Sequence, residues 1–536
     1  MPDIRMMEFQ LTLRGILERA RRLASDGEVA TLTADGGWDR YTYADAYDRI
    51  CQLAHALDDL GLDAGDRVGT VATNHSRHFE LYFAPAASAR SLHTANVRLP
   101  DDHFEYVLED AGDRVLFVDP AFVDRVEQHA PSLSHVEQYV VLAEEVPETS
   151  LDPVVAYEDL LAGHPTEYDW PTPDPEAECG LCHTSGTTGL PKGVQHTHRG
   201  LARASAMMQQ ADTVAVTEAD TVMPVVPMYH GYAWGYPYAA TLAGADLVLP
   251  GPHTDAETLV EALERERVTL TAAVPTVWID VAAHLESGDA DLSSLERIQT
   301  GGSSPPASLL RRYEETFDVP MLQAWGMTET APFATLARAP PDVPADERLD
   351  YRSTAGRPVA GIEVRVRDDG ATVPRDGESA GELEVRGEWV IDAYNDRPEA
   401  DVESFTEDGW LRTGDVATWD ERGFVNVVDR LKDVIKSGGE WISSVELENE
   451  LMAHPDVRSA AIVGVSDDTW QERPFGFVVP AADATVDTAA LDAHLRERFP
   501  KWWLPDGYEV VEQLPTTSTG KFDKRRLAER AEGSDA

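Results

Sequence analysis

The chain has 536 residues and a formal net charge of −51, with 96 acids against 45 lysines and arginines. A surface of that sign repels phosphate backbones, so we expect no nucleic-acid partner. The length predicts more than one domain. The opening residues are too polar for a signal peptide, which favours a cytoplasmic protein.

The acids are spread along the whole chain and form no long block. Such a chain repels itself strongly at low ionic strength, but at molar salt the Debye length falls to about 3 Å and the repulsion largely vanishes. We interpret this composition as adaptation to a salt-rich cytoplasm, as in a halophilic archaeon. The alternative, an ordinary protein with an acidic tail, fits poorly because the acids are dispersed.

In chain order, the first marked element is an apolar strand expected to end at Cys182. Its string Cys-Gly-Leu-Cys-His matches a haem-attachment pattern, but no export signal precedes it and no second cysteine pair completes a zinc site, so we predict neither group. Residues 221–245 contain no Asp, Glu, Lys or Arg. Their prolines, glycines and His230 argue against a transmembrane helix and predict a buried, bent wall.

Residues 254–327 alternate between helix and strand patterns. A capping box at Thr254 and Glu257 opens a helix, and further strands and helices follow at 268–274, from Pro275, at 297–300, after Pro305 and at 321–325. This alternation predicts an α/β fold with a doubly wound parallel sheet. Ligands of such sheets bind at the carboxyl ends of strands, where residues 301–304 and 326–330 fall.

From residue 356 the chain changes to short alternating runs with glycine and aspartate turns, which predict a small β-barrel or β-layer to about 428. After it, 443–457 is typical of an amphipathic helix and 459–465 of a strand. We therefore expect a large N-terminal domain over 1–428, a hinge at 429–434, and a small mobile α/β domain over 435–536.

Only six residues of the chain are lysines, and four of these lie in glycine-rich or hydroxyl-rich motifs: Lys192, Lys432, Lys436 and Lys521. Lysine is rare in this chain, and most of its lysines lie in motifs that could hold an anion. In the loop 183–193, His-Thr-Ser-Gly-Thr-Thr-Gly-Leu-Pro-Lys-Gly, glycines allow close approach while hydroxyls and Lys192 donate to phosphate oxygens. Its spacing is not that of a Walker A loop.

This loop is one of five motifs, with Trp-Gly-Met-Thr-Glu (325–329), Gly-Trp-Leu-Arg-Thr-Gly-Asp (409–415), Asp-Arg-Leu-Lys-Asp-Val-Ile-Lys-Ser-Gly-Gly-Glu (429–440) and Pro-Thr-Thr-Ser-Thr-Gly-Lys (515–521). Together and in this order they resemble the acyl-adenylate-forming (AMP-binding) superfamily. Within it, residues 225–245 and 436–449 are most similar to long- and medium-chain fatty-acyl-CoA synthetases.

The resemblance implies a two-step ligase that uses Mg²⁺, with ATP and CoA as co-substrates. A fatty acid and MgATP would give acyl-AMP and pyrophosphate, and the CoA thiol would then displace AMP. An aryl or branched acid, a carrier-protein phosphopantetheine as acceptor, and a non-enzymatic nucleotide-binding regulator remain alternatives. Relatives also imply a possible homodimer.

The resemblance assigns the first-step chemistry to four residues. Glu329 and Thr184 would bind Mg²⁺, since carboxylate and hydroxyl oxygens suit that ion. Lys521 would neutralise the charge that grows at the α-phosphate and carboxylate, which requires the small domain to close over the large one. His230 would lie beside the acyl carboxylate, although a lone histidine is also common in cores.

The remaining assignments concern ATP and CoA. Asp415 and Arg430 would hold the ribose, Lys432 would be the hinge about which the small domain rotates between the two steps, and Trp325, where tyrosine is more usual, would line the adenine pocket or only pack. Residues 301–303 would serve adenine or only begin a helix, and Trp441 would contact ligand or core. The expected set is Ser185, Gly186, Thr187, Thr188, Gly189, Lys192, Gly301, Gly302, Ser303, Trp325, Gly326, Met327, Thr328, Asp415, Arg430, Lys432, Lys436, Gly438, Gly439 and Trp441.

Overall fold

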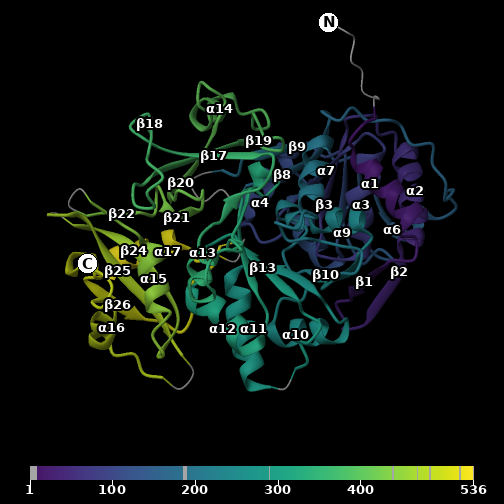
Figure 1. Cartoon of the computed structure of the whole chain (residues 1–536). Helices are drawn as coiled ribbons and strands as arrows, with labels where there is room; N and C mark the ends of the chain where they lie inside the picture. Colours follow the sequence, from purple (N-terminus) through teal and green to yellow (C-terminus); the bar gives the residue numbers. More distant parts are fainter. Residues whose placement is uncertain are drawn as a thin grey trace, which may run out of the picture.

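The computed structural model describes residues 9–184, 190–288, 290–437, 440–467, 469–481, 484–517 and 521–534. The N-terminal part of the chain builds two mainly parallel sheets with helices around them, a third sheet follows, and the C-terminal part forms a separate small lobe (Figure 1). This is the α/β architecture that the alternating pattern predicts.

The first sheet runs in the order β7-β6-β5-β3-β4-β8-β9. Neighbouring strands are parallel except β8 and β9, which form an antiparallel pair around the predicted phosphate loop. The strands are β3 (Arg67–Val71), β4 (Ser91–Thr94), β5 (Val115–Val118), β6 (Gln138–Val141), β7 (Val154–Ala156), β8 (Glu178–His183) and β9 (Gly193–Thr197).

The second sheet runs in the order β16-β15-β14-β13-β12-β10-β11-β1-β2, with a parallel centre and antiparallel edges. Its strands are β1 (Glu28–Leu32), β2 (Trp38–Thr42), β10 (Thr221–Pro224), β11 (Asp246–Leu249), β12 (Leu270–Ala273), β13 (Arg297–Gly301), β14 (Met321–Trp325), β15 (Thr335–Leu336) and β16 (Arg357–Pro358). The doubly wound prediction is therefore confirmed over this region.

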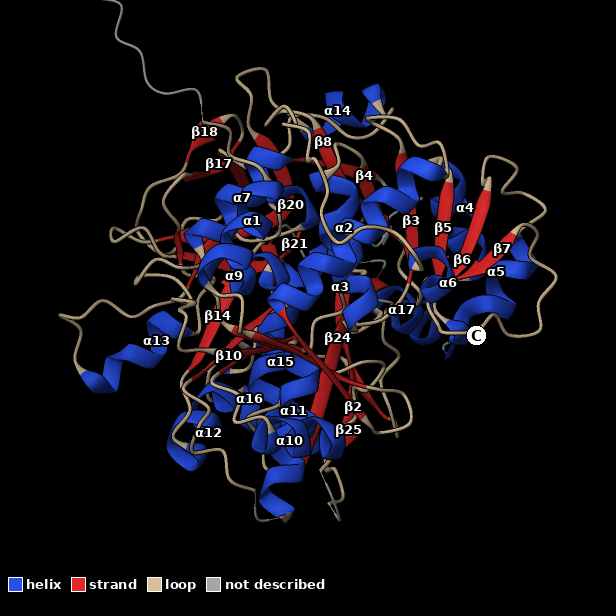
Figure 2. Cartoon of the chain, turned by 90° about the vertical axis from the view of Figure 1, so that its right-hand side faces the viewer, coloured by secondary structure: helices blue, strands red, loops and turns tan. Residues whose placement is uncertain are grey.

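Helices fill the space between these sheets and cover their outer faces (Figure 2). The inner layer is α1 (Leu13–Leu23), α2 (Tyr43–Asp59), α3 (Ser76–Ala87), α6 (Tyr157–Leu161), α7 (His198–Met207) and α9 (Tyr236–Ala243). The outer helices are α4 (Asp101–Ala111) and α5 (Val123–His129) on the first sheet, and α10 (Ala256–Arg265), α11 (Pro275–Ser287) and α12 (Ala307–Phe317) on the second. Because both faces of each sheet are covered, the parallel strands are buried and apolar.

The uncharged segment 221–245 is buried and bent, as expected. After β10 (Thr221–Pro224) the chain is irregular, and α8 (Gly231–Trp234) is a left-handed turn. Tyr232, Ala233 and Trp234 have φ of 52°, 48° and 54°, and α9 begins after Gly235. Across the described residues, no helix combines the length and apolarity needed to cross a membrane.

The third sheet is antiparallel in the order β18-β17-β19-β20-β21, where the sequence predicts a small β-rich unit. Its strands are β17 (Ile362–Asp368), β18 (Ala371–Thr372), β19 (Gly381–Gly387), β20 (Leu411–Trp419) and β21 (Val425–Arg430). The short helix α14 (Pro398–Ser404) contacts β20 of this sheet, whereas α13 (Arg348–Arg352) packs against α12 and β14 of the second sheet.

The C-terminal lobe has a sheet with helices on both faces, α15 and α16 on one and α17 on the other. Its elements are β22 (Ile435–Ser437), β23 (Glu440–Ile442), α15 (Ser444–Leu451), β24 (Val457–Asp467), β25 (Gln471–Pro480), α16 (Thr488–Leu495), β26 (Gly507–Val510) and α17 (Lys524–Ser534). β21 ends at Arg430 and β22 begins at Ile435, so residues 431–434 of the predicted hinge connect the two sheets, while residues 429 and 430 belong to β21.

Three predicted boundaries are wrong. Asp255, not Thr254, caps α10, because its carboxylate accepts the Thr258 N–H. The helix expected over 443–457 stops at Leu451, so β24 begins at Val457 instead of residue 459. The strand expected over 268–274 is shortened to β12, because Val274 already precedes the first turn of α11.

Candidate active site

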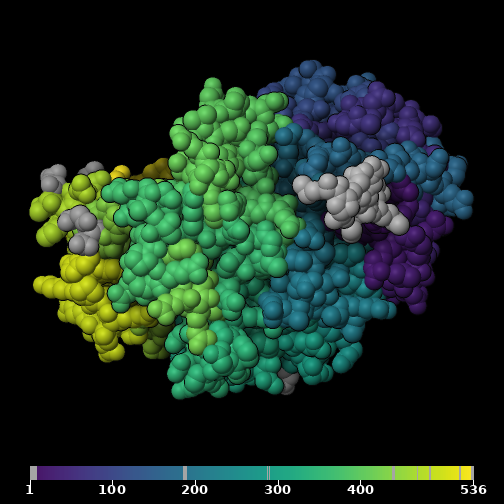
Figure 3. All heavy atoms as spheres, turned by 45° about the horizontal axis from the view of Figure 1, so that its top comes forward, coloured from purple at the N-terminus to yellow at the C-terminus, as the bar shows by residue number. Residues whose placement is uncertain are grey.

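A cavity of about 1550 Å³ lies where the C-terminal lobe meets the N-terminal sheets. Figure 3 shows this lobe, in yellow, at one end of the molecule against the teal and green segments. The cavity is lined by most of the predicted site: Thr184, Lys192, His230, Gly301, Gly302, Ser303, Trp325, Gly326, Met327, Thr328, Glu329, Asp415, Arg430, Lys432 and Lys521. Segments more than 300 residues apart in the sequence therefore converge.

Some predicted residues do not join this group. Lys436 and Trp441 face each other across β22 and β23, are exposed, and are absent from the described lining of the cavity. Ser185, Gly186, Thr187, Thr188, Gly189, Gly438 and Gly439 lie outside the described residues. Of the four lysines that lie in motifs expected to hold an anion, Lys192, Lys432 and Lys521 thus line one cavity in this arrangement.

The two ends of the phosphate loop are tied together by the β8–β9 pair. The Thr184 N–H donates to the Lys192 carbonyl at 2.9 Å, and the Lys192 N–H donates to Thr184 Oγ1 at 3.0 Å. The Lys192 ammonium lies 4.7 Å from the centre of the Tyr394 ring and 3.5 Å from Ser404 Oγ. A cation is therefore held at the mouth of the loop by an aromatic face, a favourable contact for it.

Glu329 is a buried carboxylate at the carboxyl end of β14. The Tyr394 hydroxyl donates to its Oε1 at 2.8 Å, and the side chain of Lys192 lies over the same tyrosine ring. Burial raises the pKa of Glu329, opposed by the Tyr394 hydrogen bond and by the charges of Arg430 and Lys192. A buried carboxylate of this kind is stabilised when a cation binds beside it.

Asp415 is 2% exposed and both of its oxygens have partners. Arg430 Nε lies 2.8 Å from Oδ1, and the Trp325 indole N–H donates to Oδ2 at 2.9 Å. Trp325 is thus more than a packed aromatic, because it orients the carboxylate expected to receive the ribose.

Lys521 reaches the N-terminal part from the C-terminal lobe. A Cβ added to Gly302, whose φ is +82°, would lie 3.5 Å from the Lys521 Cε. Burial lowers the pKa of Lys521 to about 8, and the positive charges of Arg430 and Lys432 act in the same direction. An ammonium among other cations is poised to receive an anion.

His230 lines the same cavity at the start of α8. Burial, together with the charge of Lys521, lowers its pKa to about 4, so the imidazole is neutral near pH 7. Of the aromatic series that follows it, Trp234 lines the cavity and lies 3.4 Å from a Cβ added to Gly301. Tyr232, Tyr236 and Tyr238 are buried in the core instead, so these three side chains contribute mainly to stability.

Sequence reasoning missed Tyr394, Ser404 and Arg397, which come from the turn after the third sheet's β19 and from α14. The stretch that holds Tyr394 and Arg397, Tyr-Asn-Asp-Arg at 394–397, has the composition of an ordinary polar turn. A tyrosine and an arginine among turn residues were the available signal, but only the fold brings them to the phosphate loop.

Comparison with known proteins identifies the family of the chain. The model of the AMP-binding enzyme family matches residues 18–395, and that of its C-terminal domain matches 446–521. A long-chain-fatty-acid–CoA ligase of Thermus thermophilus is 44% identical, over 98% of this chain and 96% of the relative. A 3-methylmercaptopropionyl-CoA ligase of Ruegeria pomeroyi is 39% identical over 98% of both, and a medium-chain-fatty-acid–CoA ligase of Ectopseudomonas oleovorans 38% identical over 98% and 97%.

Solved structures share the fold over nearly the whole chain. An anthranilate CoA ligase in complex with anthranoyl-AMP superposes with a TM-score of 0.89 at 26% identity, covering 99% of this chain and all of that one. An amide bond synthetase from Marinactinospora thermotolerans gives 0.82 at 28% identity, over 97% and 99%. With both family models matched in order and the site assembled in one cleft, the chain belongs to the AMP-binding enzyme family.

Proposed function

We propose that the protein is an AMP-forming acid–CoA ligase that activates a fatty acid as acyl-AMP and then transfers the acyl group to CoA. The observation that carries this proposal is the convergence of Lys521, Lys192 and Arg430 on one cavity that also holds Glu329 and Asp415. A chain of net charge −51 concentrates cations where a triphosphate and a carboxylate have to meet.

In the first step the carboxylate oxygen attacks the α-phosphorus of ATP and pyrophosphate leaves. Two anions approach each other, so fixed positive charge supplies much of the catalysis. Lys521 would neutralise the charge between carboxylate and α-phosphate, Lys192 would hold the leaving phosphates, and Asp415 would accept the ribose hydroxyls. The neutral His230 would orient the acid by hydrogen bonding without adding charge.

Mg²⁺ fits the donor set of this cavity. Glu329 offers a buried carboxylate oriented by Tyr394, and Thr184 offers a hydroxyl oxygen. Among the described residues no group of three or more His, Cys, Asp and Glu side chains is arranged to hold a metal by itself. This matches Mg²⁺, which is usually bound by one or two carboxylates together with substrate phosphates. When bound, it would neutralise phosphate charge.

The acid is proposed to be a fatty acid, because relatives at 44% and 38% identity carry that name. An alkyl chain gains about 0.8 kcal/mol for each buried methylene, and the uncharged Gly231 and Trp234 line the cavity beside His230, where such a chain could pack. One observation favours a second candidate, an aryl acid. The flat Trp234 indole against Gly301 is suited to an aromatic ring.

For the second step we propose that the C-terminal lobe rotates about residues 429–434, with Lys432 at the hinge. The support is that Lys436 and Trp441 are exposed on a different part of the lobe from Lys521, where a rotation could bring them to the cavity. Free CoA is the proposed acceptor. A carrier-protein phosphopantetheine remains the alternative.

We further propose that the protein works in the salt-rich cytoplasm of a halophile, supported by the dispersed acidic charge. A homodimer follows from the resemblance alone, and light scattering in molar salt tests it.

The test is pyrophosphate exchange into ATP with straight-chain, branched and aryl acids, followed by loss of free CoA thiol. Exchange that depends on a straight-chain acid, with thiol loss, supports the proposal. If only aryl acids give exchange, the second candidate is selected. If exchange occurs without loss of CoA thiol, a carrier-protein acceptor is selected. If no acid gives exchange while ATP binds, the protein is a nucleotide-binding regulator instead.

A further inference from the structure

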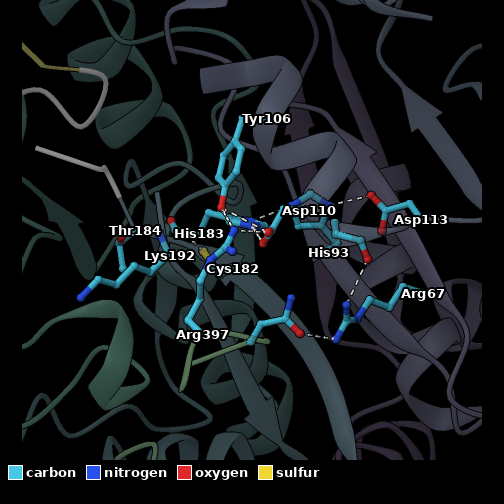
Figure 4. Close-up of polar contacts among 12 residues, drawn as sticks. Arg67, His93, Tyr106, Asp110, Asp113, Cys182, His183, Thr184, Lys192 and Arg397 are labelled. Carbon is cyan, nitrogen blue, oxygen red and sulfur yellow. Dashed lines mark hydrogen bonds and ion pairs between the residues drawn. The ribbon is translucent and has the colours of Figure 1, made fainter. Parts of the chain in front are cut away.

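Behind the phosphate loop, four side chains form a continuous chain (Figure 4). His93 on β4 and His183 on β8 lie between Asp110 on α4 and Asp113, which follows that helix. Asp110 is partly exposed, and the other three are buried. Asp113 Oδ2 lies 2.7 Å from His93 Nδ1, His93 Nε2 lies 3.2 Å from His183 Nδ1, and His183 Nε2 lies 3.1 Å from Asp110 Oδ2. His93 and Asp113 are 0% and 1% exposed in their side chains. His183 is the residue directly before Thr184.

Arg397 and Tyr106 complete this chain at its outer end. Arg397 Nη2 lies 2.6 Å from Asp110 Oδ1, and the Tyr106 hydroxyl donates to the same oxygen at 3.1 Å. Arg397 also contacts the Tyr106 hydroxyl. Figure 4 shows Tyr106 and Arg397 meeting Asp110 from opposite sides. The arginine thus fastens the turn after Tyr394 to helix α4.

The position of Arg397 explains why an arginine closes this group. Asp110 is partly buried, and its other side-chain partners are His183 and the Tyr106 hydroxyl. Arg397 places a positive charge beside this carboxylate, which compensates for its partial removal from water.

The surrounding backbone is built to make room for the chain. A Cβ added to Gly69 on β3 would lie 2.2 Å from Asp113 Oδ2, so only glycine fits there. Beside it, Arg67 pairs with Glu178 at 2.7 Å and donates to Asn395 Oδ1 at 3.0 Å. The Asn395 N–H in turn donates to the Gly193 carbonyl at 2.9 Å.

Two segments that carry active-site groups are therefore fixed by the same network. Residues 183–193 supply Thr184 and Lys192, and residues 394–397 supply Tyr394, which contacts both Lys192 and Glu329. Asp110, His93 and Arg397 are absent from the described cavity lining. The network would therefore act on a ligand in the cavity only through the two segments that it fixes.

We propose that Arg397 and Asp110, through His183 and His93, are positioning residues that set the place of the phosphate-loop ends against Tyr394 and Glu329 for ATP binding and adenylation. The role in adenylation rests on the proposed function, whereas the role in ATP binding does not. A displacement of about 1 Å in such a site costs up to about a hundredfold in rate, so loss of the network should be visible in ATP kinetics.

The experiment compares Arg397→Met, Arg397→Lys and Asp110→Asn with Arg422→Met in the full-length protein. Arg422 makes an ion pair of the same kind with Asp342 on the exposed surface, at 3.0 Å, and lines no part of the cavity. For each variant, the dissociation constant of ATP is measured by calorimetry, KM and kcat by pyrophosphate exchange, and the melting temperature by circular dichroism.

The expected result is an ATP dissociation constant and KM about tenfold higher in Arg397→Met and Asp110→Asn, with KM for the acid changed less than about twofold. Arg397→Lys should show a smaller rise in the ATP dissociation constant and KM than Arg397→Met. Arg422→Met should show no rise in either quantity. ATP affinity and KM within about twofold of wild type in both network variants would overturn the proposal, as would an equal loss in Arg422→Met. If a network variant is too unstable to measure, Arg397→Lys, which retains the charge, decides by the same ATP readouts.

The outcome is separable from that of the proposed function. Should wild type bind ATP but give no exchange with any acid, the proposed function fails, while calorimetry still compares the variants. Should wild type give exchange and the variants keep normal ATP affinity and KM, the positioning proposal fails alone.

Discussion

The Trp325 indole nitrogen donates a hydrogen bond to Asp415 Oδ2 across 2.9 Å. Trp325 ends a strand of the second sheet and Asp415 belongs to the third, so this bond joins two sheets at the cavity. The tryptophan fixes the orientation of a carboxylate that Arg430 holds from its other side. The proposed ribose site is therefore oriented before any nucleotide binds.

Replacing Trp325 by phenylalanine retains the ring and removes the donor. Hydrogen bonds to charged groups contribute about 1.5–3 kcal/mol, so we expect kcat/KM for ATP to fall about 10- to 100-fold. KM for the acid should change little. Trp419→Phe is the control, since its indole donates at 3.2 Å to the Val373 carbonyl in the same sheet, outside the described cavity lining. An equal loss of ATP kinetics in both variants would contradict a specific role for Trp325.

Lys521 should determine how kcat/KM for acyl-AMP formation falls at alkaline pH. Its pKa of about 8 means that the free enzyme carries the ammonium below that pH and loses it above, so kcat/KM for acyl-AMP formation should fall as pH rises through about 8. Lys521→Arg should move this fall to higher pH. Because the folded pKa lies below the ordinary 10.5, this lysine also makes the free energy of unfolding rise with pH between those values.

Lys521→Ala should abolish acyl-AMP formation from acid and ATP, while thioester formation from supplied acyl-AMP remains measurable. Lys501→Ala, which removes an exposed lysine of the same lobe, should leave both half-reactions unchanged. Equal loss of both half-reactions in Lys521→Ala would reject the alternation of the lobe between two steps.

The sequence predicted the parts of the site that local pattern determines. Glycine spacing and hydroxyl order mark the phosphate loop, and a strand followed by Gly-Met-Thr-Glu places Glu329 at a carboxyl end. Tyr394 and Arg397 could not be predicted, because their roles depend on a long-range packing that brings a polar turn beside β8. The same limit applies to Tyr232 and Tyr238, whose uncharged pattern is equally compatible with a ligand wall and with a core.

Tyr394→Phe tests the group that sequence reasoning missed. The loss of its hydroxyl leaves the buried Glu329 without this donor, which favours the protonated acid and should raise the pKa of Glu329 further. We expect the Mg²⁺ concentration for half-maximal exchange to rise about tenfold, the cost of roughly one hydrogen bond to a charged group. Raising the pH from 6 to 8 should restore part of the loss, because it favours ionised Glu329. A metal requirement equal to that of wild type at both pH values would argue against Glu329 as the ligand.

Salt dependence tests the interpretation of the charge. Lowering the salt concentration below about 0.5 M lengthens the Debye screening distance and restores repulsion among the acids, so activity and melting temperature should both fall. Potassium chloride and sodium chloride should act alike if screening is the cause. Undiminished activity after desalting would remove the halophile proposal and leave the ligase proposal intact.

The pair Lys524–Glu448 should matter for stability and not for adenylation. Lys524 Nζ lies 2.8 Å from Glu448 Oε1, which also accepts the Ile462 N–H at 2.8 Å, so the pair fastens α17 to α15 across β24. Burial raises the pKa of Glu448 to about 7 despite its partner. Removing the ammonium leaves this carboxylate buried and unpaired, which costs about 3–5 kcal/mol. We therefore expect Lys524→Ala to lower the free energy of unfolding of the C-terminal lobe by about 3 kcal/mol in a denaturant titration.

The double variant Lys524→Met with Glu448→Gln should recover most of that loss, since a neutral, well-filled replacement of a buried ion pair is often no less stable than the pair. Lys501→Ala again serves as the exposed control. If Lys524→Ala unfolds at the wild-type denaturant concentration, the lobe does not depend on the pair. If it loses adenylation at wild-type stability, then Lys524 acts on ATP beside Lys521, and the division between a structural and a catalytic lysine only three residues apart is wrong.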